Sequence, residues 1–164
     1  MTQYELKKAA ELSEMIVKNA CNLVAEAIDG ATGNHISAAH INRPVEELVR
    51  RARQHYNDGM HESAEDAAIS SFNSMNDLGI ALYELFSDTY AAKLFAREAA
   101  KDRTDTFEQE VFCPDEIGYV VLPNGAVEKT NTAKVVVRFR GSDYVSPFGM
   151  PFDIVTAYPV KEDV

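Results

Sequence analysis

The sequence has few of the residues that build disulfide frameworks or metal centres. Its two cysteines, Cys21 and Cys113, form no CxxC pair and have no metal-ligand spacing. Two are too few for a disulfide framework, although a single disulfide between them stays open. A reducing compartment therefore fits this composition at least as well as an oxidising one.

Long apolar runs are also absent. No stretch approaches the roughly 20 apolar residues of a membrane-spanning helix, and the opening MTQYELKKAAELSEM lacks the apolar core of a signal peptide. We expect neither a membrane span nor classical export from these residues. Delivery by another route, or as a piece of a larger protein, would leave no trace in them.

The common nucleotide, nucleophile and zinc motifs are missing, since the chain has no GxxxxGK, GxGxxG, GxSxG or HExxH. His61-Glu62 followed by Glu65 comes nearest to a zinc helix but lacks the second histidine one turn later. We interpret that segment as a solvated turn and helix start, and we predict no metal and no cofactor.

Basic residues are fewer than acidic ones in this sequence. The 164 residues carry 16 Lys and Arg against 26 Asp and Glu, a formal net charge of −10. Residues 61–164 hold nine basic and eighteen acidic groups, whereas residues 1–60 have a net charge of only −1. This balance argues against binding nucleic acid by broad neutralisation of phosphates. It leaves room for a small cationic pocket.

The length and the 46% of hydrophobic residues suit one domain over 1–164, with no repeat or linker. Apolar residues at three- and four-residue spacing predict an N-terminal helical segment within 1–34, as one long helix over 3–29. A second helix is predicted to begin beside Pro44 and to reach about Tyr56.

Further helix is predicted from a capping box at Ser63 and Asp66 to about Ala100, with interruptions near Gly79 and Asp88. The period then changes to two in the segments FEQEVFC, EIGYVVL, AKVVVRFR and FDIVTAYPV, which tight turns separate. Helices first and strands last predict an α+β fold, with N-terminal helices packed against a C-terminal, meander-like antiparallel β-sheet.

Two short stretches hold the candidate functional residues. The first, HINRPVEELVRRARQHY from His40, is the main basic island, and helical phase sets Arg51 at the edge of its apolar stripe, where it can face a cleft. In the second, Thr156 and Tyr158 are two residues apart and share one face of an extended strand. A basic solvated helix face and an ordinary strand are the alternative interpretations.

Together these stretches resemble the RNase A-like toxin domains at the C-terminus of bacterial contact-dependent growth-inhibition proteins, the CdiA type. The resemblance covers roughly residues 35–160 and lies in His40 followed by Arg51, the Ser/Ala-rich stretch ESAEDAAISSFNSMNDLGIAL, and DIVTAYP. It implies a metal-independent ribonuclease with His40, Arg51, Thr156 and Tyr158 in its active site. Family members tend to carry a glycine and a basic residue after the histidine. Here Asn42 takes the place of the glycine, and Arg43, a candidate substrate-binding residue, keeps the charge.

These residue types suit RNA cleavage by attack of the 2′-hydroxyl on the phosphodiester, which needs a base, an acid and positive donors. Histidine changes its charge near neutrality, so His40 suits one proton transfer, and Arg51 can grip two phosphate oxygens. Thr156 can hydrogen-bond a phosphate or a base edge, and Tyr158 can position phosphate or donate a proton. His35 is the nearest substitute for His40.

The resemblance implies RNA as the substrate, with transfer RNA as one candidate, and a cognate immunity protein as a partner. It implies action in the cytoplasm of a target bacterial cell after secretion or delivery as part of a larger protein. Two alternatives remain: a catalytically inactive relative that binds RNA or protein, and an acidic immunity protein that covers a basic nuclease.

Overall fold

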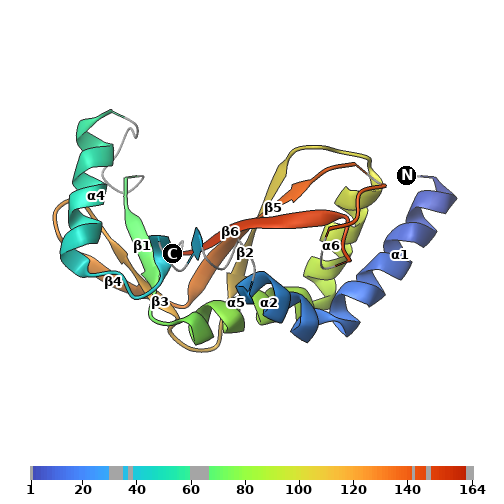
Figure 1. The fold of residues 1–164 in the computed structure, drawn as a ribbon, viewed down its shortest axis with the longest axis horizontal. Coiled ribbons are helices and arrows are strands. Elements are labelled where there is room, and N and C mark those ends of the chain that lie inside the picture. The colour runs from blue at the N-terminus through green and yellow to red at the C-terminus, as the bar shows by residue number, and fades with distance from the viewer. Residues whose placement is uncertain are drawn as a thin grey trace.

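The computed structural model describes residues 2–29, 35–36, 39–59, 67–141, 143–146 and 149–161. Helices make up its N-terminal part, and the antiparallel sheets are built largely from its C-terminal part (Figure 1). This order confirms the α+β prediction. Several predicted features lie wholly or partly outside the described residues: the helix end at Gly30, the segment from His61 to Asp66, and the turns containing Ser142, Pro147 and Phe148.

The first predicted helix is present as two, α1 (Gln3–Lys18) and α2 (Ala20–Asp29). Thr2 caps α1, because its hydroxyl accepts a hydrogen bond from the backbone N–H of Glu5 at 3.1 Å. The break falls at Asn19, whose side-chain amide donates to a backbone carbonyl one turn earlier and so competes with the helical ladder.

The second predicted helix, α4 (Val45–Asn57), begins directly after Pro44. Proline suits this place because the first N–H groups of a helix have no intrahelical partner. Glu46 and Glu47 lie in the first turn, where carboxylates complement the helix dipole. The chain turns away at Gly59, which adopts a φ of 68° that favours glycine.

Two helices follow, α5 (Met75–Ser87) and α6 (Thr89–Ala100). The predicted interruption at Asp88 is confirmed, because its carboxylate caps the first turn of α6 at 3.0 Å. The predicted interruption at Gly79 is wrong, and α5 runs through it. A Cβ at Gly79 would lie 3.3 Å from the Cδ1 atom of Ile28, so the glycine allows α2 to pack closely against α5.

The described strands form two three-stranded antiparallel sheets, where the sequence predicted one meander. The first sheet consists of β2 (Thr106–Phe112), β5 (Thr132–Phe139) and β6 (Phe152–Val160), in that order. The second consists of β1 (Ile69–Phe72), β3 (Gly118–Val121) and β4 (Val127–Thr130), also in that order.

β1 corrects the sequence prediction, which placed these residues in a helix. Ser70, Ser71 and Phe72 are buried, and every residue of β1 pairs with β3. This pairing outweighs the helical pattern of the flanking alanines. β4 was not predicted either, because its sequence VEKT is largely polar and its strand lies at a sheet edge.

The core lies between the helices and one face of the first sheet. Phenylalanine rings stack there, with Phe95 of α6 5.7 Å from Phe152 of β6 between ring centroids. Aromatic pairs at such distances stabilise a core beyond their buried area. Alternation along the strands turns Lys134 of β5 and Tyr158 of β6 toward the opposite face.

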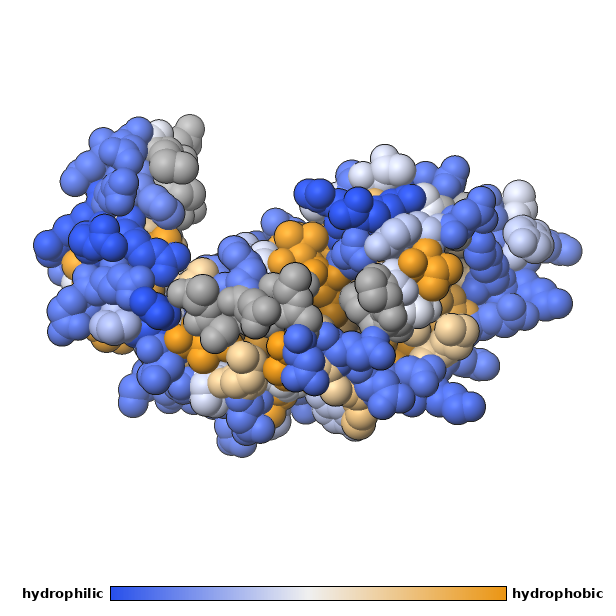
Figure 2. Space-filling view, in the orientation of Figure 1, coloured by the Kyte–Doolittle hydropathy of each residue, from blue (hydrophilic) through white to orange (hydrophobic). Residues whose placement is uncertain are grey.

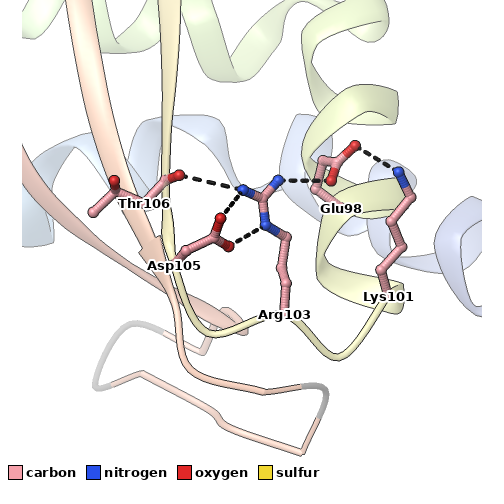
Figure 3. Close-up of polar contacts among 5 residues, drawn as sticks. All are labelled: Glu98, Lys101, Arg103, Asp105 and Thr106. Atoms are coloured by element: carbon pink, nitrogen blue, oxygen red, sulfur yellow. Dashed lines mark hydrogen bonds and ion pairs between the residues drawn. The ribbon is translucent and has the colours of Figure 1, made fainter.

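An ion-pair cluster ties the end of α6 to the start of β2 (Figure 3). The guanidinium of Arg103 donates to Glu98 at 2.7 Å and to both carboxylate oxygens of Asp105. It also lies 5.3 Å from the ring centroid of Phe139 and 5.6 Å from that of Phe107. Because Arg103 combines ion pairs with aromatic contacts, we assign it a structural role.

The two sheets meet where β3 passes beneath the end of β6. A Cβ at Gly118 would lie 2.4 Å from the carbonyl oxygen of Ser71 and 2.7 Å from the Cγ atom of Pro159, so only glycine fits. Nearby, the hydroxyl of Thr130 donates to the carbonyl of Val160 at 2.6 Å. These contacts fix the strand that carries Tyr158.

Candidate functional site

His40 lies in the segment between α2 and α4, held against β1. Its Nδ1 atom is 3.3 Å from the carbonyl oxygen of Ser70. A carbonyl can only accept, so in this contact Nδ1 carries the proton, and the lone pair of the neutral ring is on Nε2. The next residue, Ile41, forms a parallel bridge with Phe72. The backbone of β1 thereby sets the position and tautomer of the histidine.

Asn42 has the left-handed φ of 48°. Glycine adopts this conformation without cost, and asparagine is among the few other residues that tolerate it. The backbone N–H of Asn42 donates to the carbonyl of Phe72 at 2.7 Å, so the conformation belongs to the turn that follows His40. Asparagine thus meets the conformational demand at a position where the resembled family tends to have glycine.

The Arg43 side chain forms an ion pair with Glu47 in the first turn of α4. Its Nη2 atom lies 2.6 Å from the Glu47 carboxylate, and its Nε donates to the same oxygen at 3.1 Å. Its carbonyl accepts from the Tyr119 hydroxyl at 2.5 Å. Arg43 therefore anchors the start of α4 to β3, and a phosphate would have to compete with Glu47 for its guanidinium.

Arg51 is half-buried, as its place at the edge of the apolar stripe predicts, whereas Arg50 and Arg53 are exposed. The Nη1 atom of Arg51 donates to the carbonyl of Ala39 at 3.0 Å. That carbonyl belongs to the residue directly before His40. The bond fastens α4 to the histidine segment and holds the guanidinium near the imidazole.

Thr156 and Tyr158 share one face of β6, opposite Val136 and Lys134 of β5 in the strand register. A register shift follows at Val136, and Val155 is the additional residue on β6. The Thr156 hydroxyl oxygen is buried and has no hydrogen-bond partner in the part of the chain that the structure describes. A buried hydroxyl without a partner is costly, so it is suited to accept or donate a bond to a ligand.

The structure brings the two distant stretches together. The ring centroids of His40 and Tyr158 are 5.8 Å apart, and the His35 ring lies 6.1 Å from His40. Figure 2 shows an open notch beside α4, and the ribbon in Figure 1 runs the C-terminal end of β6 toward the foot of α4. Of the predicted site residues, His40 and Tyr158 are in ring contact, and Thr156 lies on the same face of β6 as Tyr158. Arg51 is bound to the carbonyl of Ala39, next to His40.

The surroundings set the charge of both rings. Burial lowers the pKa of His40 below its ordinary value of 6.5. The Ser70 carbonyl raises this pKa, and the electrostatic influence of Arg51 and His35 lowers it further. Burial also raises the pKa of Tyr158, which Lys134 partly offsets. At neutral pH the site therefore holds a neutral imidazole beside a neutral phenol.

Lys134 and Glu108 lie beside this pair, and neither was predicted from the sequence. Lys134 is directly opposite Tyr158 in the register of β5 and β6, and its Nζ atom is 3.4 Å from the Glu108 carboxylate on β2. Strand pairing alone brings them together, and the register cannot be read from spacing along the chain.

The other cavities and clusters lie elsewhere. A cavity of about 800 Å³ lies between α1 and α6 and is lined by none of the predicted site residues. Within the described ranges, no three His, Cys, Asp or Glu side chains are grouped so that they could hold a metal ion. None of the helices in those ranges is both long and apolar enough to cross a membrane.

Neither a family model nor a curated protein matches the chain. Among solved structures, it is similar to the crystal structure of a CdiA-CT/CdiI complex from Y. kristensenii 33638, with a TM-score of 0.55 and 19% sequence identity. The match covers 74% of this chain and 95% of the other. At this identity, the similarity shows a shared fold.

Proposed function

We propose that the chain is a metal-independent endoribonuclease toxin that cleaves RNA by attack of the 2′-hydroxyl on the adjacent phosphodiester. The observation that carries the proposal is the ring contact of His40 with Tyr158, 5.8 Å between centroids, beside Arg51. It brings a residue that precedes α4 against a residue of the last strand. The similarity in fold to a CdiA-CT/CdiI complex, a toxin–immunity pair, supports the same class.

His40 suits the role of general base. Its lowered pKa keeps it neutral at pH 7, and the Ser70 carbonyl leaves the lone pair on Nε2. In the first part of the reaction, Nε2 takes the proton of the 2′-hydroxyl while the bond between O2′ and phosphorus forms. RNA supplies its own nucleophile, so no covalent bond to the protein is needed.

Tyr158 suits the role of general acid for the departing 5′-oxygen. As the bond between phosphorus and O5′ breaks, the phenol donates its proton to O5′, because an alkoxide is a stronger base than a phenolate. Water then returns a proton to Tyr158 and removes the one on His40, so that both groups regain their starting states. The products are a 2′,3′-cyclic phosphate and a free 5′-hydroxyl.

Arg51 and Thr156 supply donors for the phosphorane. Arg51 keeps its charge and has guanidinium N–H groups besides the Nη1 contact to Ala39. The buried Thr156 hydroxyl is poised for a phosphate oxygen or a base edge. Oriented donors of this kind each contribute about 10²–10³ in rate when charge develops on the oxygens.

As a toxin, the chain would act in the cytoplasm of a target bacterial cell and would need an immunity protein in the producing cell. The net charge of −10 predicts weak binding of RNA and so a need for a specific or locally abundant substrate. A locally abundant substrate such as transfer RNA fits this requirement.

The activity assay uses RNA in EDTA, with the wild-type chain, His40→Ala and the control His55→Ala on α4. We expect wild type and His55→Ala to cleave, and His40→Ala to lose about 10²–10⁴ in rate. A substrate with 2′-deoxyribose at the cleaved position should resist all three proteins. No cleavage by the wild type, or equal cleavage by His40→Ala, would contradict the proposal.

The net charge of −10 favours a second candidate, an acidic immunity protein. Expression inside a bacterial cell distinguishes the two. A ribonuclease toxin should arrest growth, with relief by Arg51→Gln or His40→Ala, whereas an immunity protein should be harmless and should protect against a toxin.

A further inference from the structure

A lysine faces the candidate site from the strand next to Tyr158. Lys134 and Tyr158 are direct partners in the β5–β6 register, and side chains directly opposite each other in an antiparallel pair lie about 5 Å apart at Cβ. The lysine side chain is 28% exposed, so most of its stem is covered while the ammonium group can reach solvent. β5, which carries Lys134, lies on one side of β6 in the sheet, whereas His40 is held by β1, which also contacts β6.

Lys134 has a raised pKa and a long ion pair. Burial alone would lower its pKa, but Tyr158, Glu108 and Glu110 outweigh this effect and raise it. The contact with Glu108 spans 3.4 Å, whereas the Arg43 pair with Glu47 spans 2.6 Å. Glu108 is itself 54% exposed, so this ion pair contributes little and can exchange partners.

The other basic side chains near the site have shorter, better-directed bonds. Arg43 is bound to Glu47, and Arg51 donates to the carbonyl of Ala39. In a chain with a net charge of −10, a cation on the tyrosine side would add to Arg51 in stabilising a phosphate at the His40–Tyr158 contact. Lys134 lies on that side.

We propose that Lys134 is a further substrate-binding residue, which exchanges the Glu108 carboxylate for the scissile phosphate of the RNA. The inference rests on the proposed function, because it concerns the same site. Glu108 is then a resident counter-ion that the incoming phosphate displaces, and Lys134 and Arg51 hold the phosphate from its two flanks.

The test measures both binding and cleavage. Binding uses a short 2′-O-methyl oligonucleotide, which has phosphodiesters but no 2′-hydroxyl nucleophile, and cleavage uses the matching RNA. We expect Lys134→Gln to weaken binding at least tenfold and to lower kcat/KM about 100-fold, with Lys134→Arg recovering most of both. Glu108→Gln should tighten binding several-fold, because it removes the competing carboxylate.

The control is Lys129→Gln, which removes the same charge from an exposed position on β4. It should bind and cleave like the wild type, which separates a local contact from a change in net charge. Thermal unfolding of each variant shows whether it is folded. Wild-type affinity in Lys134→Gln, or a loss in Glu108→Gln as large as in Lys134→Gln, would overturn the assignment of Lys134.

The two proposals fail in different ways. If the wild-type chain binds the 2′-O-methyl oligonucleotide through Lys134 but leaves RNA intact, the ribonuclease proposal fails and the phosphate site stands. If the wild-type chain cleaves RNA and Lys134→Gln cleaves equally well, only the Lys134 assignment fails. Absence of binding by the wild type contradicts the Lys134 assignment directly.

Discussion

The imidazole of His40 and the phenol of Tyr158 lie 5.8 Å apart between ring centroids, although one precedes α4 and the other lies in the last strand. β1 makes the meeting possible, because its Ser70 carbonyl contacts His40 and its neighbour β3 passes beneath the end of β6. The contact joins a base that is neutral at pH 7 to a donor that is also neutral.

The first prediction concerns the pKa of His40, which burial, Arg51 and His35 all lower. Arg51→Gln removes one positive neighbour and should raise the pKa toward 6.5, so that the histidine is protonated at a higher pH. NMR titration of the histidine ring measures this directly, with His55 as the internal control. An unchanged His40 titration would show that Arg51 does not influence the imidazole.

The second prediction concerns Tyr158→Phe, which removes the phenol and keeps the ring. We expect the rate to fall by about 10²–10⁴ with little loss of stability, because the ring contact with His40 remains. Since the pKa of Tyr158 is raised, wild-type activity should persist to alkaline pH and fall only above about 10. Wild-type rates in Tyr158→Phe would remove the phenol from the reaction.

The third prediction concerns Gly118, where an added Cβ would collide with Ser71 and Pro159. Gly118→Ala should destabilise the fold by about 1–3 kcal/mol and shift the end of β6 away from His40, so activity should fall as well. The control is Gly79→Ala, where the neighbouring atom is the flexible end of the Ile28 side chain. Replacing glycine by alanine within a helix stabilises the helix by about 1 kcal/mol. Chemical denaturation measures the unfolding free energy of both variants. Equal stability of the two variants would contradict the close approach at Gly118.

The fourth prediction concerns Arg103, whose guanidinium bridges Glu98 and Asp105 and lies over two phenylalanine rings. Arg103→Lys keeps the charge but loses the planar fork, and should cost about 1 kcal/mol of unfolding free energy. RNA cleavage should be unchanged, because the cluster lies outside the candidate site. Arg97→Lys, at an exposed position of α6, serves as the matched control and should have no measurable effect.

The fold was predictable wherever a local pattern carried it. The alternation in residues 152–160 and the three- and four-residue spacing in α4 gave the right elements. β1 was not predictable, because ISSF follows alanines that favour a helix and becomes a strand only by pairing with β3. The division into two sheets depends on the same long-range pairing.

The site was predictable only in part. The resemblance to toxin domains singled out His40, Arg51, Thr156 and Tyr158, and the structure brings His40 and Tyr158 into contact. Their roles in a reaction remain predictions. Lys134 gave no signal in the sequence, because a lone lysine in a strand is ordinary and only the register places it opposite Tyr158. The left-handed conformation of Asn42 also became visible only in the backbone.

The most direct test of the central claim identifies the product of RNA cleavage in EDTA. If His40 and Tyr158 assist attack by the 2′-hydroxyl, mass spectrometry should find 2′,3′-cyclic phosphate and 5′-hydroxyl ends with the wild-type chain. His40→Ala should reduce these ends at least 100-fold. Ends of another kind, or the same yield from His40→Ala, would contradict the account.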